Sequence, residues 1–169
     1  MRICAAIVFA LSLCLPAAAQ ETPIAELFEQ FGLFGSWAAR CDKEPSLDNV
    51  RATISRQETD NVIEDDDPGQ GYQVNRYTIV KAKKVADDQL SVEVVYRPNT
   101  KEEQRQEQIW LVRDGSWRTM MNKPKGERAR VKNGVVVGTT IKTPVLRKCG
   151  DAPVRRQATL RGRMRHSPG

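Results

Sequence analysis

Residues 89–122 read QLSVEVVYRPNTKEEQRQEQIWLVRDGSWRTMMN, and this stretch decides the fold. From Leu90 to Tyr96 apolar residues alternate with polar ones, as a half-buried strand requires. A second strand-like run, 104–113, is joined to a third, 116–122, by Asp114-Gly115. Asp-Gly between two such runs is a strong β-hairpin signal. The stretch therefore predicts three consecutive antiparallel strands.

The same pattern continues on both sides of this stretch, and no long segment keeps helical periodicity. Asp87-Asp88 and Asn133-Gly134 mark further turns, and the acidic run 64–69 reads as an exposed loop. The predicted strands are 35–41, 49–57, 71–84, 89–97, 104–113, 116–122, 127–132 and 135–148. Closing such a meander removes its two unpaired edges. We therefore expect an all-β fold, an eight-stranded antiparallel up-and-down barrel.

A short helix is predicted ahead of the first strand. Thr22 is a candidate cap, Pro23 suits the first helical position and Gly32 suits the stop. The apolar residues at helical spacing are Ile24, Leu27, Phe28 and Phe31. A helix of this length is marginal alone in water, so we expect its apolar face to dock on one end of the barrel.

The first 19 residues have the composition of a secretory signal peptide. Arg2 precedes an apolar run from Ile3 to Leu15, and small residues follow at 17–19. The run is shorter than the roughly 20 residues that a membrane-spanning helix needs. Removal of 1–19 leaves a barrel domain, 20–149, and a tail, 150–169. We expect the protein to be exported, to the periplasm or outside the cell, and to be a monomer.

The positive net charge of +6 lies mostly in that tail, which we expect to be disordered. A nucleic-acid-binding domain would carry its charge on a folded face, so we expect no nucleic acid partner. The tail arginines are candidates for contact with anionic surfaces of the cell envelope, although the tail is equally expected to have no such role. They are Arg155, Arg156, Arg161, Arg163 and Arg165.

Two cysteines remain after the leader is removed, Cys41 and Cys149. In an oxidising compartment two thiols indicate one disulfide. In a closed barrel the first and last strands are neighbours, and these strands carry the two cysteines. The disulfide would therefore join the two strands at the seam of the barrel.

The segment Phe34-Gly35-Ser36-Trp37 begins the first strand after the short helix. A Gly-x-Trp in this place resembles the lipocalin and wider calycin families. The resemblance implies that Trp37 packs across the closed end of the barrel beneath an arginine from the last strand, for which Arg147 is the candidate. Barrel-type bacterial metalloprotease inhibitors also have an early tryptophan and one disulfide. The Phe-Gly-x-Trp-x-x-x-Cys stretch, through Cys41, is similar to that of invasion-associated locus B proteins and of uncharacterised exported proteobacterial proteins.

Catalytic motifs are scarce. The only histidine is His166, in the tail, so the barrel domain offers no Ser-His-Asp or Cys-His arrangement. No phosphate-binding glycine loop or metal-ligand cluster stands out, so we expect neither a cofactor nor a metal. We expect a protein that is not an enzyme.

An eight-stranded barrel either packs its own side chains or holds one small ligand. Glutamines alternate along 104–113 on the same face as a tryptophan. If that face points inward, a polar mouth lies above an apolar floor, as in a ligand site, and Trp110 should be partly accessible from the mouth. If it points outward, Ile109 and Leu111 form the core instead. Candidate ligand-binding residues are Tyr96, Gln104, Gln106, Gln108, Trp110 and Trp117. We expect the barrel to bind a small, partly apolar ligand. The alternative is a protein-binding module of the cell envelope, such as a protease inhibitor.

Overall fold

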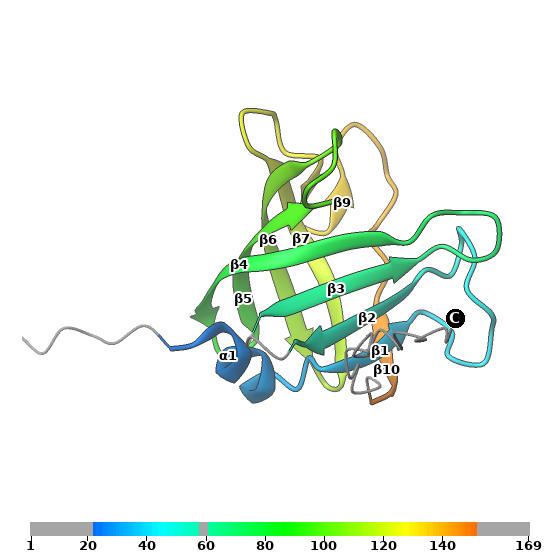
Figure 1. The fold of residues 1–169 in the computed structure, drawn as a ribbon, viewed down its shortest axis with the longest axis horizontal. Helices are drawn as coiled ribbons and strands as arrows, with labels where there is room; N and C mark the ends of the chain where they lie inside the picture. The colour runs from blue at the N-terminus through cyan, green and yellow to red at the C-terminus, as the bar shows by residue number, and fades with distance from the viewer. Residues whose placement is uncertain (1–21, 58–60, 152–169) are drawn as a thin grey trace, which may run out of the picture.

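The computed structural model describes residues 22–57 and 61–151, and these form an antiparallel β-barrel with one short helix (Figure 1). The leader 1–19 and the tail arginines lie outside the described residues. The helix is α1, Ile24–Gln30. The strands are β1 Gly35–Ala38, β2 Arg51–Arg56, β3 Val62–Asp67, β4 Asn75–Ala86, β5 Gln89–Tyr96, β6 Gln104–Arg113, β7 Ser116–Pro124, β8 Val131–Lys132, β9 Val135–Val136 and β10 Leu146–Gly150.

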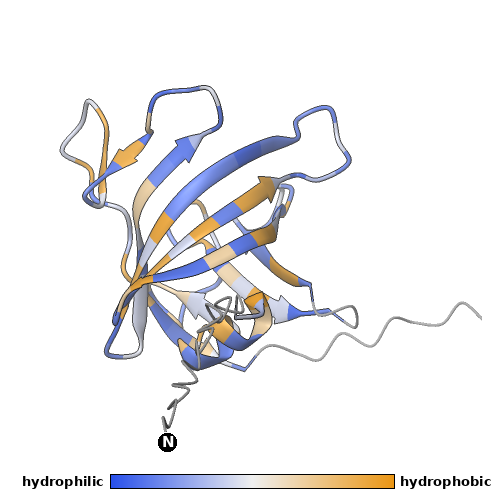
Figure 2. Cartoon of the chain, turned by 90° about the vertical axis from the view of Figure 1, so that its left-hand side faces the viewer, coloured by the Kyte–Doolittle hydropathy of each residue, from blue (hydrophilic) through white to orange (hydrophobic). Residues whose placement is uncertain are grey.

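Eight of these strands close the barrel, which confirms the predicted fold class. Strands β1 to β7 pair in chain order, and β10 pairs with both β1 and β7. The predicted turns at Asp114-Gly115 and Asn133-Gly134 have positive φ at both residues, as tight hairpin turns require. Figure 2 shows hydrophobic and hydrophilic residues alternating along several strands, because successive side chains of a strand point to opposite faces.

The strand assignment differs from prediction in three places. The predicted last strand, 135–148, is divided into β9 and β10, which are separated by residues 137–145. Residues 64–69 were expected to be an exposed loop, but Glu64 to Asp67 belong to β3, which pairs with β2 and β4. The predicted strand 127–132 is reduced to β8, which forms a two-residue hairpin with β9 outside the closed ring. Strand β3 was not predicted because of its acidic composition. Its carboxylates occupy positions where strands usually carry apolar residues.

Helix α1 covers one end of the barrel, as predicted. It ends at Gln30, Gly32 two residues later has a φ of +64°, and Leu33 N–H donates to the Phe28 carbonyl at 2.9 Å, a glycine-type helix stop. Phe28 is fully buried and meets the Trp110 ring edge-on, with 5.7 Å between centroids. The helix therefore closes the floor of the barrel.

Trp37 is also buried, with 2% of its surface exposed, in one apolar cluster with Leu27 and Phe28. Its indole Nε1 donates to the Leu33 carbonyl at 2.8 Å. Gly35, two residues earlier, has a φ of +139°, and a Cβ there would lie 2.6 Å from the Gly150 oxygen of β10. Only glycine fits where β1 and β10 approach this closely.

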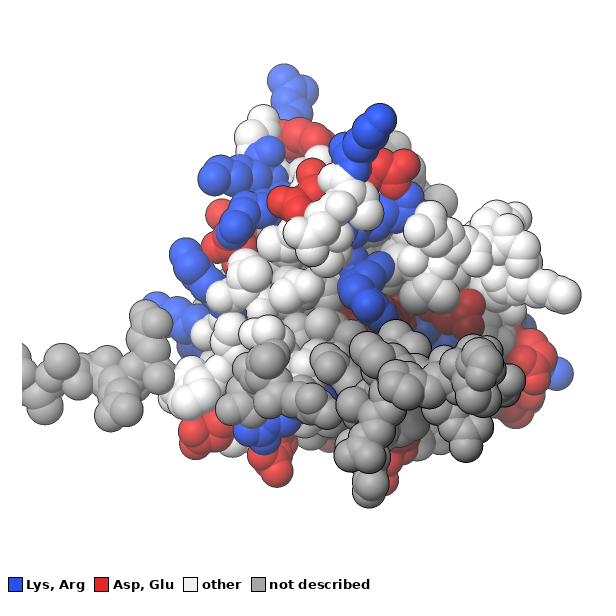
Figure 3. All heavy atoms as spheres, in the orientation of Figure 1, with Lys and Arg blue, Asp and Glu red and all other residues white. Residues whose placement is uncertain are grey.

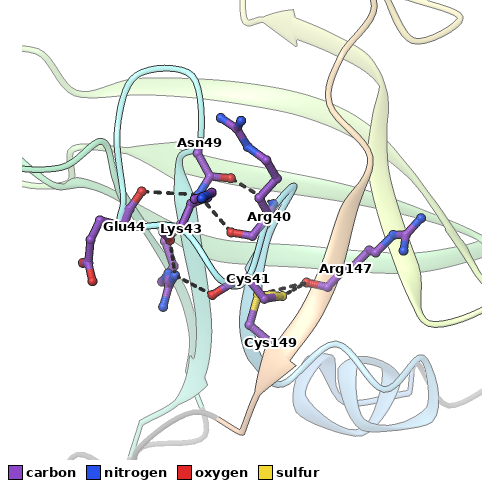
Figure 4. Close-up of a disulfide and its surroundings, with 8 residues drawn as sticks. Arg40, Cys41, Lys43, Glu44, Asn49, Arg147 and Cys149 are labelled. Carbon is purple, nitrogen blue, oxygen red and sulfur yellow. Dashed lines mark hydrogen bonds between the residues drawn. A yellow bond between two sulfur atoms is a disulfide. The ribbon is translucent and has the colours of Figure 1, made fainter.

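The predicted disulfide is present. Cys41, just after β1, is bonded to Cys149 of β10, with 5.2 Å between their Cα atoms (Figure 4). Because β1 and β10 pair with each other, the disulfide links the first and last strands of the barrel at its seam. Among the described residues, no helix has the length and apolar character needed to cross a membrane.

Candidate ligand pocket at the barrel mouth

A pocket of about 580 Å³ opens at the end of the barrel opposite α1. Its walls come from the mouth halves of β2 to β7, from β8 and β9, and from the loops that precede β2 and β10. No residue of α1 lines it. The floor beneath it is aromatic, because Trp117 and Trp110 stack with 4.6 Å between ring centroids. The pocket is thus a polar mouth above an aromatic floor.

The β6 wall is formed by glutamines whose side chains point into the barrel. The ligand hypothesis requires this orientation. Gln106 and Gln108 are each 6% exposed, whereas Arg105 and Glu107, which alternate with them along β6, are exposed. Trp110 Nε1 donates to Gln108 Oε1 at 2.7 Å. The chain of bonds continues upward from Gln108 to Gln106, from Gln106 to Gln104, and from Gln104 to the Glu127 carboxylate.

This chain has a fixed direction. At the floor an indole N–H can only donate, and at the rim a carboxylate can only accept, so each amide between them is held in one orientation. Asn122 of β7 adds a bond from Nδ2 to Gln106 Oε1 at 2.8 Å. The glutamine wall therefore presents a fixed set of amide groups to the pocket.

The β3 wall carries two carboxyl groups inside the barrel, Glu64 and Asp66, which share a hydrogen bond. Glu64 is 5% exposed, and Asp66 is only partly exposed. Burial raises the pKa of Glu64 well above its ordinary value, and the neighbouring Asp66 raises it further. Burial also raises the pKa of Asp66 to about 7, although the hydrogen bond with Glu64 acts in the opposite direction. Near neutral pH the pair therefore holds a proton that ordinary carboxylates have lost.

Two tyrosines stand beside the carboxyl pair. Tyr77 of β4 is directly opposite Glu64, and its ring is 5.1 Å from that of Tyr96. Burial raises the pKa of Tyr77, and the acidic groups of Asp66 and Glu64 raise it further. Tyr96 donates to Asn75 Oδ1 at 3.0 Å, and the guanidinium of Arg97 lies 5.2 Å from the centre of its ring. The wall from β3 to β5 is therefore acidic and aromatic.

The opposite wall, from β7 and β8, carries two arginines. Arg118 Nη2 donates to the Gly134 carbonyl at 2.7 Å, and Arg130 Nη2 donates to Glu127 Oε2 at 2.9 Å. Trp117, also in the pocket wall, is 4% exposed. Its buried Nε1 and the buried Oδ1 of Asn122 have no hydrogen-bond partner among the described residues. Leaving such groups unpaired in a fold is costly.

The loop from β1 to β2 forms one side of the mouth and is held by Asn49 (Figure 4). The Asn49 side chain is 2% exposed; it accepts from Arg40 N–H at 2.9 Å and donates to the Arg40 carbonyl at 3.0 Å. Arg51 adds a bond to the Lys43 carbonyl at 2.8 Å. These bonds lie next to the Cys41 disulfide, so the loop is fastened at both its ends.

The structure brings most of the predicted ligand residues together. Tyr96, Gln106, Gln108 and Trp117 line the pocket. Gln104 and Trp110 do not: Gln104 extends the hydrogen-bond chain to the rim, and Trp110 has no exposed surface. The expectation that Trp110 is accessible from the mouth is therefore wrong, because Trp117 and α1 enclose it.

Arg147 does not occupy the position that the lipocalin resemblance implied. Leu146 points inward and is buried, so Arg147, one residue later, falls on the outer face and is exposed. It pairs with Ala38 rather than with Trp37. Figure 4 shows its side chain directed away from the disulfide.

Sequence reasoning missed the pocket residues Glu64, Asp66, Tyr77, Asn122 and Asn49. The sequence did carry a signal for Glu64 and Asp66. Val62 and Ile63 are β-branched, as strand residues often are, and in a strand that begins at 62 the residues 62, 64 and 66 share one face. Asn49 had no sequence signal, because its role depends on the loop that folds around it.

Within 22–57 and 61–151, no group of three or more histidine, cysteine or acidic side chains is arranged to hold a metal ion. The arrangement offers hydrogen bonds, aromatic surface and a titrating carboxyl pair. No protein-family model, curated protein or solved structure matches this chain.

Proposed function

We propose that this protein is an exported, periplasmic or secreted, non-enzymatic binding protein that holds a small, partly apolar ligand at the mouth of its barrel. The observation that carries the proposal is the pocket of about 580 Å³, because ligand sites are typically clefts of about 300–1,000 Å³ with a few placed polar groups. Its aromatic floor suits an apolar body. The resemblance to lipocalins is in keeping with this function.

The test is a fluorescence titration with N-phenyl-1-naphthylamine, an uncharged apolar probe. Ala39 is exposed and lines the pocket, so Ala39→Trp places a large side chain at the mouth with little effect on the core. Ala86, exposed at the other end of β4, is the matched control as Ala86→Trp. The wild type and the control should bind the probe, and Ala39→Trp should bind it at least ten times more weakly. Equal binding by all three would contradict the proposal.

A second candidate function, a protein-binding module, is favoured by the rim. Six large apolar side chains are exposed on the loops around the mouth. They are Leu47, Tyr72, Val74, Val137, Ile141 and Val145. Figure 3 shows uncharged surface projecting on the side where the β1–β2 and β3–β4 loops lie in Figure 1. Scattered apolar side chains are normal on protein surfaces, so the pocket at the barrel mouth is the stronger observation. The two functions separate on Tyr72→Ser/Ile141→Ser, because neither residue lines the pocket; this variant would weaken a protein contact and leave probe binding in the pocket intact.

A further inference from the structure

We infer that the ligand carries a positively charged ammonium or guanidinium group, which Glu64 and Asp66 bind, while its apolar body lies over Trp117. This inference rests on the proposed function and names the chemical class of its ligand. It is argued from the composition of the two pocket walls.

The first observation is the position of the carboxyl pair. Glu64 and Asp66 lie in the wall of a pocket large enough for a small molecule, side by side on one strand. The charges that act on them come from each other and from Asp65. Arg76, on the adjacent strand β4, forms its ion pair with Asp65, at 2.7 Å. The pair therefore receives no cation from β2 or β4; the arginines that line the same pocket, Arg118 and Arg130, lie in its opposite wall, where Arg118 bonds the Gly134 carbonyl and Arg130 pairs with Glu127.

The groups facing the pair agree with a cation. On one side β2 contributes only Ala52 and Ile54, which are apolar. On the other side β4 contributes Asn75, opposite Asp66, and Tyr77, opposite Glu64, whose ring packs with Tyr96. Aromatic faces attract cations, most strongly in desolvated sites. A carboxyl pair beside two tyrosines is thus chemically suited to an ammonium group.

The second observation is independent of the carboxyl pair. The indole of Trp117 lines the same pocket and is buried, yet its Nε1 has no partner among the described residues. The Asn122 Oδ1 atom, in the same wall, is also unpaired. A ligand with polar groups of its own that reached these atoms would satisfy a buried donor and a buried acceptor in one pocket wall. A purely hydrocarbon ligand would leave both unsatisfied.

Binding of such a ligand should be linked to pH. A cation is attracted to the deprotonated pair, so its affinity should rise as pH increases through about 7, where Asp66 loses its proton. An alkylammonium group, like that of lysine, stays charged to about pH 10. The charged and titratable groups around the pair are Tyr77, Asp65 and Arg76 on β3 and β4, with Arg118 and Arg130 in the opposite wall of the pocket. Burial raises the pKa of Tyr77, so its phenol stays neutral in this pH range.

The experiment compares three probes with one indole body, tryptamine, tryptophol and indole-3-acetate, by isothermal titration calorimetry at pH 8. The wild type should bind tryptamine about 10- to 100-fold more tightly than tryptophol, the range expected for a hydrogen bond to a charged group. Indole-3-acetate should bind most weakly. The preference for tryptamine should shrink at pH 6.

The matched variants are Glu64→Gln/Asp66→Asn, which removes the charge and keeps the shape, and Glu107→Gln, which removes an exposed carboxylate on the outer face of β6. The double variant should bind tryptamine and tryptophol equally, and Glu107→Gln should behave as wild type. Equal affinities in the wild type, or a preference that survives in the double variant, would overturn the inference. If the wild type shows no preference for tryptamine but binds tryptophol and N-phenyl-1-naphthylamine, the inference of a cationic ligand fails and the proposed function stands. If no probe binds, the inference and the proposed function both fail.

Discussion

The buried carboxyl pair should make the protein less stable as pH rises from 5 to 8. In the unfolded chain Asp66 titrates near its ordinary pKa of 3.8, whereas in the fold its pKa is about 7. Between these values the folded state holds more protons than the unfolded state, so the free energy of unfolding falls with rising pH. The loss begins near pH 4 and is complete above about pH 7.

The size of the loss follows from the pKa shift. A shift of about three units at about 1.4 kcal/mol each gives at most about 4 kcal/mol. Water at the mouth reaches the partly exposed Asp66 and reduces this figure. Glu64 acts in the same direction, since its pKa is raised as well. The surface carboxylates Glu93 and Asp87, whose pKa values are lowered by bonds to Arg105 and Lys84, act only below the measured window.

Urea unfolding followed by tryptophan fluorescence at half-unit steps from pH 5 to 8 measures the effect. Between pH 5 and 7 the titration of Asp66 should cost the wild type up to about 3 kcal/mol, while Glu64→Gln/Asp66→Asn should be nearly flat and more stable than wild type at pH 8. Glu107→Gln is the control and should keep the wild-type slope. A flat wild-type profile, or an equal slope in the double variant, would refute the assignment of a protonated pair inside the barrel.

Three further predictions concern the fold. Trp37→Ala and Trp110→Ala should each cost about 3–5 kcal/mol in urea unfolding, because both rings are buried; a small loss for Trp110 would contradict its place in the floor. Replacing Cys41 and Cys149 with serine should cost about 4–5 kcal/mol less any native strain, since the bridge closes a 108-residue separation, and the oxidised wild type should show no free thiol by thiol titration. Gly35→Ala should lower the melting temperature clearly, because its Cβ would meet the Gly150 oxygen; unchanged melting would show that β1 and β10 are not held this closely.

Turn chemistry and alternation in the sequence predicted the barrel well. Asp114-Gly115 marks a hairpin whatever surrounds it, and the Gln89–Tyr96 strand alternates in the expected way. The position of the cysteines on neighbouring strands of a closed ring predicted the disulfide. The turn and alternation signals are local, and the disulfide position follows from the closure of the barrel. Both can therefore be predicted without knowing how the side chains pack.

The pocket was harder to predict because its polar groups contradict the usual rule for inward positions. Glu64 and Asp66 read as a solvated loop, since carboxylates are rarely buried. The direction of the glutamine face was left conditional, because Ile109 and Leu111 offered an equally apolar alternative. Trp110 was placed at the wrong depth, because the sequence does not show that Phe28 of α1 reaches it.

Native mass spectrometry of the protein purified from its own cells tests the central claim most directly. The wild type and Ala86→Trp should carry a fixed additional mass that is lost on denaturation, and Ala39→Trp should carry little of it. A wild-type protein that is always bare, or an additional mass that persists equally in Ala39→Trp, would contradict a ligand site at the mouth of the barrel.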